Sequence, residues 1–202
     1  MSRVYCQQCH RPEKACICAF SVHINNHIHV VILQHPSEIK QSKGTVSLLH
    51  QSLMHCEVIV GENFTDNNIF TTLLSYYGDN IALLFPSEDA IEINFSSHNR
   101  ASITAETCDN KHIECIIILD GTWKKAYKMF MVNPCLHKVK HLVLPEGIES
   151  LYHIRKTKKN NALSSLEACC YALARLEDNE KKYQPMLEGF IKFNQFQHSF
   201  SQ

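Results

Sequence analysis

The sequence predicts an α/β fold in which a mostly parallel sheet is flanked by helices. Short runs of aliphatic residues alternate along the chain with segments of helical spacing, and this alternation is typical of parallel strands joined by crossover helices. The 202 residues are 45% hydrophobic and 20% charged, which is ordinary for a globular chain of one domain. This composition excludes collagen, coiled coils and intrinsic disorder.

The expected strands are short, rich in β-branched residues and closed by polar or proline residues. We expect them over residues 28–33, 57–60, 81–85, 113–119 and 141–144. Helices are expected where apolar side chains recur every three or four residues, over 45–56, 69–76, 124–132, 163–176 and 182–200. Residues 87–112 are polar and irregular, which indicates an insertion or an edge hairpin.

Ten cysteines are an unusual number, and four of them crowd the N-terminus, at Cys6, Cys9, Cys16 and Cys18. Two closely spaced pairs can supply the two edges of a tetrahedron, which predicts a structural zinc site with four thiolates. A redox pair is the alternative, although such a motif normally follows a strand and opens a helix. His10 is a further possible ligand, awkwardly placed beside Cys9. We therefore expect a zinc-binding segment over 1–22 and a main domain over 23–202.

The compartment follows from what the sequence lacks. Residues 1–9 contain no apolar stretch of the kind found in signal peptides, so we expect a cytoplasmic protein with reduced thiols. The apolar runs, such as Ile116–Leu119, are too short to cross a bilayer, so no membrane partner is expected.

The formal net charge of zero hides two oppositely charged regions. Residues 56–114 carry ten acids and two bases, whereas residues 124–159 carry nine bases and two acids, a net charge of +7. A basic stretch of this kind predicts a polyanionic partner such as RNA, with a solvated basic face as the alternative. The residues that we expect to contact RNA are Lys124, Lys125, Lys128, Arg155, Lys156, Lys158 and Lys159.

Ligands of parallel sheets bind beyond the carboxyl ends of the strands. Four loops should meet there, at 34–38, 85–87, 120–123 and 145–147. No G-x-G-x-x-G and no G-x4-G-K-[ST] motif occurs, so neither a Rossmann nor a P-loop phosphate site is expected.

The loop after the strongest strand carries the residues best suited to chemistry. Asp120, Thr122 and Trp123 follow that strand, and His35 and Glu38 follow the first one. We take these five as catalytic candidates. The alternatives are that Asp120 only caps a helix and that the sole tryptophan packs in the core.

Four motifs, in this order, resemble those of the DTW-domain family. They are Cys6-x2-Cys9-x-Arg11-Pro12-x3-Cys16-x-Cys18, Leu33-Gln-His-Pro-Ser-Glu38 with Lys43-Gly-Thr45, Leu119-Asp-Gly-Thr-Trp123 with Lys125, Ala126 and Met129, and Leu163-Ser-Ser-Leu-Glu-Ala168. The last motif more often reads Leu-Ser-Thr, so Ser165 is a departure that keeps the hydroxyl. Ser164 and Glu167 also fit a helix capping box.

The resemblance implies a tRNA-uridine aminocarboxypropyltransferase. Such an enzyme moves the 3-amino-3-carboxypropyl group of S-adenosylmethionine to N3 of a tRNA uridine and releases methylthioadenosine. The family is related to SPOUT methyltransferases, which implies a SPOUT-like trefoil knot at the cofactor site. The oligomeric state stays open.

Given that chemistry, we expect S-adenosylmethionine to be held at the ends of the central strands. The expected cofactor-binding residues are Leu84, Phe85, Pro86, Asp120, Trp123, Leu144, Leu163 and Ser164. Two other functions stay open. One is a SPOUT-like RNA methyltransferase that uses the same cofactor. The other is a zinc-ribbon RNA-binding protein without catalysis, which would explain the cysteines and the lysines but not the motif at Asp120–Trp123.

Overall fold

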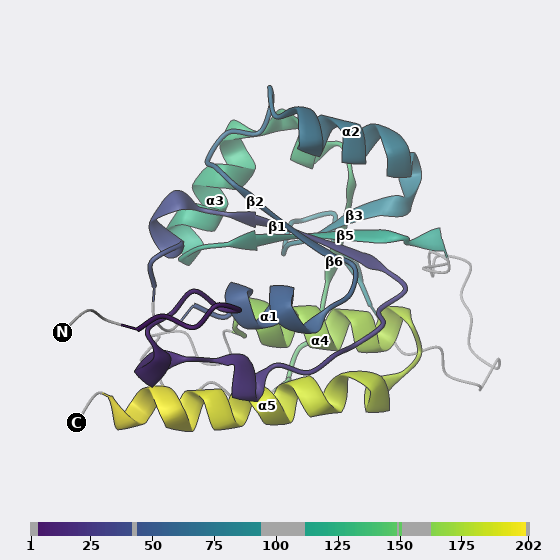
Figure 1. The fold of residues 1–202 in the computed structure, drawn as a ribbon. Helices are drawn as coiled ribbons and strands as arrows, with labels where there is room; N and C mark the ends of the chain where they lie inside the picture. The colour runs from purple at the N-terminus through teal and green to yellow at the C-terminus, as the bar shows by residue number, and fades with distance from the viewer. Residues whose placement is uncertain (1–3, 42–43, 94–111, 149, 151–162, 201–202) are drawn as a thin grey trace.

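A six-stranded sheet forms the centre of the molecule (Figure 1). In this computed structural model, residues 4–41, 44–93, 112–148, 150 and 163–200 are described. The strand order is β2-β1-β5-β3-β6-β4, and every neighbouring pair is parallel. The strands are β1 (His29–Gln34), β2 (Cys56–Val60), β3 (Ile81–Leu84), β4 (Ile91–Glu92), β5 (Cys115–Asp120) and β6 (Lys140–Val143). The predicted α/β class with a mostly parallel sheet is confirmed.

Helices cover both faces of the sheet, as crossover connections in a parallel sheet require. They are α1 (Val46–Ser52), α2 (Asn68–Tyr77), α3 (Trp123–Val132), α4 (Ser165–Leu176) and α5 (Glu180–Ser199). Helices α2 and α3 lie on one face, α1 and α4 lie on the other, and α5 packs outside α4 (Figure 1). In the described part of the chain, no helix combines the length and apolarity needed to cross a membrane.

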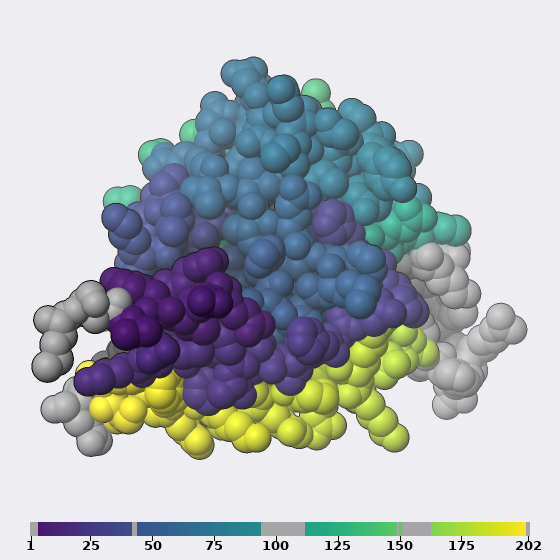
Figure 2. All heavy atoms as spheres, viewed as in Figure 1, coloured from purple at the N-terminus to yellow at the C-terminus, as the bar shows by residue number. Residues whose placement is uncertain are grey.

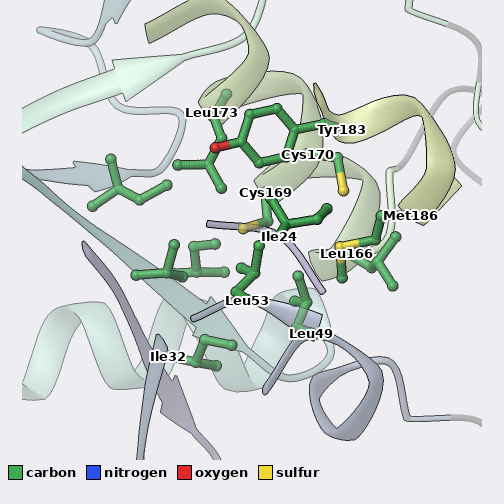
Figure 3. Close-up of a cluster of buried hydrophobic side chains, with 14 of the residues drawn as sticks. Ile24, Ile32, Leu49, Leu53, Leu166, Cys169, Cys170, Leu173, Tyr183 and Met186 are labelled. Carbon is green, nitrogen blue, oxygen red and sulfur yellow. The ribbon is translucent and has the colours of Figure 1, made fainter. Parts of the chain in front are cut away.

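Alternation along the central strands divides the core in two. Val30 and Ile32 of β1 face the cluster formed with α1, α4 and α5, whereas Val31 and Leu33 face the cluster beneath α2 and α3. Strand β5 follows the same alternation, so its even-numbered residues point towards α4. Figure 3 shows the first cluster, in which side chains of α4 and α5 meet Ile32 and the two leucines Leu49 and Leu53.

The N-terminal segment packs against the last helix. Ile17 is fully buried in the cluster that includes α4 and α5. The ring of Phe20 lies against those of Phe193 and Phe196, with centroids 6.1 and 5.1 Å apart. At Gly189 a Cβ would lie 2.5 Å from the Phe20 carbonyl oxygen, so this approach requires glycine. Figure 2 shows the purple N-terminal segment lying along the yellow C-terminal helix.

Two elements differ from those expected. Helix α1 ends at Ser52 rather than continuing to residue 56, because Leu53 turns to the extended conformation and forms a bridge with Ile24. Residues 91–92, within the stretch expected to be an insertion or an edge hairpin, form the parallel edge strand β4 beside β6. Residues 94–111 lie outside the described residues.

Candidate active site and metal site

A cavity of about 690 Å³ opens at the carboxyl ends of β3, β5 and β6. This is the edge where parallel sheets bind ligands. Its walls come from the ends of these strands, the first turn of α3, the loop after β6 and the start of α4. Of the eight expected cofactor-binding residues, seven line this cavity: Leu84, Phe85, Pro86, Trp123, Leu144, Leu163 and Ser164.

The eighth, Asp120, is not among the lining residues but is bonded to one of them. As an even-numbered residue of β5, Asp120 faces α4, and it is 9% exposed. Its carboxylate accepts hydrogen bonds from Ser165 Oγ at 2.8 Å and from Gln34 Nε2 at 3.0 Å. Gln34 lies directly opposite Asp120 in the β1–β5 register, so strand pairing places the two side chains together. Ser165 lines the cavity and therefore links it to the carboxylate.

Helix α3 is capped by another residue of the same loop. The Thr122 hydroxyl accepts from the Lys125 amide at 3.4 Å, while the side-chain bonds of Asp120 go to Ser165 and Gln34. The alternative in which Asp120 serves as the helix cap is therefore wrong. Trp123 begins the helix at the cavity and is 49% exposed, so the alternative of a core tryptophan is also wrong.

His35 and Glu38 lie beside the cavity in a charged network rather than among its lining residues. His35 Nδ1 accepts from the Ser37 amide at 3.2 Å, so Nε2 carries the proton and donates to Glu62 at 2.8 Å. Glu38 is buried, and its carboxylate accepts from Lys125 Nζ at 2.8 Å. This network attaches α3 to the loop that follows β1.

The basic residues expected to bind RNA have different surroundings. Lys125 is paired with Glu38, and Lys128 is paired with Glu62 on the surface. Lys124 is exposed and has no ion pair among the described residues. The other expected contacts, Arg155, Lys156, Lys158 and Lys159, lie outside the described residues.

The four N-terminal cysteines form one cluster. Their sulfurs all lie within 4.8 Å of one another, and the pairs Cys6–Cys18 and Cys9–Cys16 are each separated by 3.7 Å. A tetrahedral ion with Zn–S bonds of about 2.3 Å would place its sulfurs about 3.8 Å apart. The cluster could therefore hold a metal ion such as zinc. His10 does not belong to it.

The backbone around this cluster favours the thiolate of one cysteine, Cys6. The pKa of Cys6 is lowered to about 6, chiefly because the amides of Cys9 and Gln8 donate to its sulfur. Burial and the neighbouring thiols raise the pKa of Cys18 to about 12. Four thiolates in such a small volume need a cation between them, which fits a closed structural site with no position left for substrate. His10 has a φ of 55°, the turn that lets the chain leave the first cysteine pair.

Three residues of the site had no sequence signal that singled them out. Gln34 and Ser165 hold Asp120, and Glu62 holds His35 and Lys128. Ser165 belongs to the motif over 163–168, in which the predicted capping box between Ser164 and Glu167 is confirmed. Gln34 can be identified as a partner of Asp120 only once the register between β1 and β5 is known.

Three known proteins are similar to this chain over most of its length. The protein of Macaca fascicularis called tRNA-uridine aminocarboxypropyltransferase 2 is 30% identical over 202 residues, covering 96% of this chain and 64% of its own length. The Drosophila melanogaster and Mus musculus proteins of the same name are 28% and 27% identical, covering 90% and 96% of this chain. This chain spans 70% of the Drosophila protein and 64% of the mouse protein. No solved structure shows significant similarity.

The family comparison agrees with the order of the motifs. The family model described as the DTW domain matches residues 3–198, which include the cysteine cluster, the strand-end loops and the start of α4. The chain therefore belongs to the DTW-domain family.

Proposed function

We propose that this protein is a tRNA-uridine aminocarboxypropyltransferase that uses S-adenosylmethionine and modifies N3 of a uridine. The observation that carries the proposal is the pairing of Asp120 with Ser165 at the wall of the strand-end cavity. It provides a buried proton acceptor bonded to the hydroxyl of a residue that lines the cavity. The names of the three similar proteins support the same reaction class.

The cavity suits a cofactor of this size and chemistry. Its volume of about 690 Å³ lies within the range of roughly 300–1,000 Å³ that is usual for small-molecule sites. Apolar residues such as Leu84, Phe85 and Leu144 would pack on the adenine ring, and the loop backbones at 84–87 and 143–147 would bind its polar edge. Glu146 is the acidic residue of the lining, a carboxylate suited to ribose hydroxyls. When bound, S-adenosylmethionine supplies the 3-amino-3-carboxypropyl group and leaves as methylthioadenosine.

The protein's own part in the reaction is to receive the proton of uridine N3. Ser165 lines the cavity, and its hydroxyl donates its hydrogen to the Asp120 carboxylate. The hydroxyl oxygen can accept the N3 proton while its own hydrogen passes to Asp120, so the charge on the base is neutralised as N3 becomes nucleophilic. Gln34 donates to the other oxygen of the carboxylate.

The remaining parts of the chain would position the RNA and stabilise the fold. Trp123 would stack on the target uridine, which must leave its base pair or stack to expose N3. Lysines on α3 and in the segment 151–162 would bind phosphates, which orient RNA without identifying the base. The four cysteines would hold a structural zinc ion, and we further propose that the chain has the SPOUT-like knot of the related methyltransferases.

Product analysis tests the proposal against its alternatives. The purified protein is incubated with tRNA and S-adenosylmethionine labelled in the carboxypropyl group, and the nucleosides are identified by mass spectrometry. We expect a uridine carrying the added group, together with methylthioadenosine. S-adenosylhomocysteine with a methylated base would instead establish a methyltransferase. Binding of RNA without either product, and without S-adenosylmethionine binding by calorimetry, would establish the non-catalytic alternative.

A further inference from the structure

Three large side chains form an exposed stripe on α3. Trp123, Tyr127 and Met131 are 49%, 58% and 50% exposed, and they follow one another at intervals of four residues. Four residues advance a helix by about 6 Å and rotate it by about 40°, so the three side chains lie on one side of α3 over about 12 Å. We call these three residues the α3 stripe.

The stripe is not needed to pack the helix. Ala126 and Met129 are the buried residues of α3, and they belong to the core cluster beneath α2 and α3. Met129 lies about 160° around the helix from Tyr127, whereas Ala126 lies about 60° from Trp123, on the side of the cavity. Two partly exposed aromatic rings and a thioether on one helix face form the kind of surface that marks a binding site.

The stripe begins at the cavity. Trp123 lines it, and Tyr127 and Met131 continue from Trp123 along the helix. Lys124 and Lys128 lie next to the stripe on the exposed side of the helix. Lys128 shares its charge with Glu62 in a surface ion pair, whereas Lys124 has no ion pair among the described residues. Aromatic rings flanked by lysine, continuous with the cavity, match the pattern of single-stranded nucleic-acid sites.

We propose that the α3 stripe is a stacking platform for the unpaired nucleotides next to the target uridine. Trp123 stacks on the base that enters the cavity, Tyr127 stacks on a neighbouring base, and Met131 packs against the sugar or base beyond it. Lys124 neutralises a phosphate between them. This inference rests on the proposed function for its partner, an RNA strand opened around one uridine. It adds to that function a binding site for the nucleotides that flank the target.

The test is RNA binding, measured independently of catalysis. A short single-stranded oligouridylate and a bulk tRNA preparation are titrated into the full chain, and binding is followed by the fluorescence of Trp123, the single tryptophan. Tyr127→Ala removes one ring, and Tyr127→Phe keeps it. Tyr76→Ala is the matched control, because Tyr76 is more exposed than Tyr127 and lies on another helix, near the C-terminal end of α2.

Stacking on Tyr127 predicts that Tyr127→Ala weakens oligouridylate binding about 5- to 150-fold, the effect of losing one aromatic–base contact. Tyr127→Phe and Tyr76→Ala should bind like the wild type, and wild-type binding should quench Trp123. Unchanged affinity in Tyr127→Ala, or equal loss in Tyr76→Ala, overturns the proposal. A second outcome would also overturn it. Sedimentation could show that the wild type is a dimer and that Tyr127→Ala is a monomer with unchanged RNA affinity. The stripe would then bind a second copy of the chain. If the wild type binds RNA with quenching of Trp123 but transfers no group, the proposed enzyme function is refuted, while the proposed role of the stripe in RNA binding is still supported.

Discussion

Replacing Asp120 with asparagine separates the chemical role of its carboxylate from its structural one. The carboxylate accepts from Ser165 Oγ and Gln34 Nε2. Asparagine keeps the shape and one acceptor oxygen, and the Ser165 hydroxyl can rotate to accept from the new amide. Two hydrogen bonds to a charged group become neutral ones, and each change costs about 1–1.5 kcal/mol, so we expect a stability loss of about 2–3 kcal/mol. The variant should remain folded.

The expected effect on the reaction is much larger. A positioned base contributes about 10²- to 10⁴-fold, which corresponds to about 2.7–5.5 kcal/mol of the activation free energy. We therefore expect single-turnover transfer from labelled S-adenosylmethionine to tRNA to fall by that factor in Asp120→Asn. A purely structural role predicts the small loss of stability without the loss of rate.

A matched variant controls for disturbance of the network. Gln34→Met removes the other donor to Asp120 and leaves the carboxylate in place, so it should keep most of the transfer rate while losing a similar amount of stability. Thermal melting and tRNA binding are measured for all three proteins. A wild-type transfer rate in Asp120→Asn would refute the reasoning, and His35 and Glu38 would become the next candidates for the base.

Three further predictions follow from the structure. Ser165→Ala should slow transfer at least about tenfold through loss of the bridging hydroxyl, whereas Ser165→Thr should restore it; equal rates for the two variants would contradict the proton path. Elemental analysis should find about one zinc per chain, and Cys9→Ser should lower the melting temperature more than the single-turnover rate; metal-free native protein would refute the zinc site. Burial raises the pKa of Glu177, but hydrogen bonds from Lys182 and from the Ile28 and His27 amides outweigh it, so the net pKa is lowered. Glu177→Gln should therefore lower the free energy of unfolding, measured in urea at neutral pH, by about 1–3 kcal/mol. This difference should shrink as the pH falls below 4.5 and through the folded-state pKa of Glu177. A difference that does not change with pH would contradict this.

The sheet could be predicted closely from local patterns. The seven residues 113–119 predicted as the strongest strand contain most of β5, because a strand buried on both faces shows an unbroken aliphatic run. Strand β4 could not be found in this way, since its two residues lie in a polar stretch and are defined by pairing with β6 alone. Helix α1 was overestimated because apolar spacing continues through Leu53, which is buried in an extended conformation.

The sequence predicted which loops form the site, but not which side chains contact one another there. The rule that ligands bind at strand carboxyl ends brought together Phe85, Trp123 and Leu144, which lie far apart in the sequence. The rule does not say which side chains will meet across the sheet, and the bond from Ser165 to Asp120 depends on how α4 packs. Charge counting along the chain likewise missed that Glu38 and Glu62 would neutralise two lysines of α3.

The strand order also determines when the site can be assembled during synthesis. Strand β5 lies between β1 and β3 in the sheet but follows both in the chain. A nascent chain that ends before residue 115 therefore lacks the strand that joins its two halves, and β1–β2 and β3 cannot form one sheet. Such late insertion of a central strand is an arrangement of high contact order, which slows folding and leaves strand edges exposed meanwhile. Because β5 ends in Asp120, the strand that joins β1 to β3 is also the one that carries the proposed base.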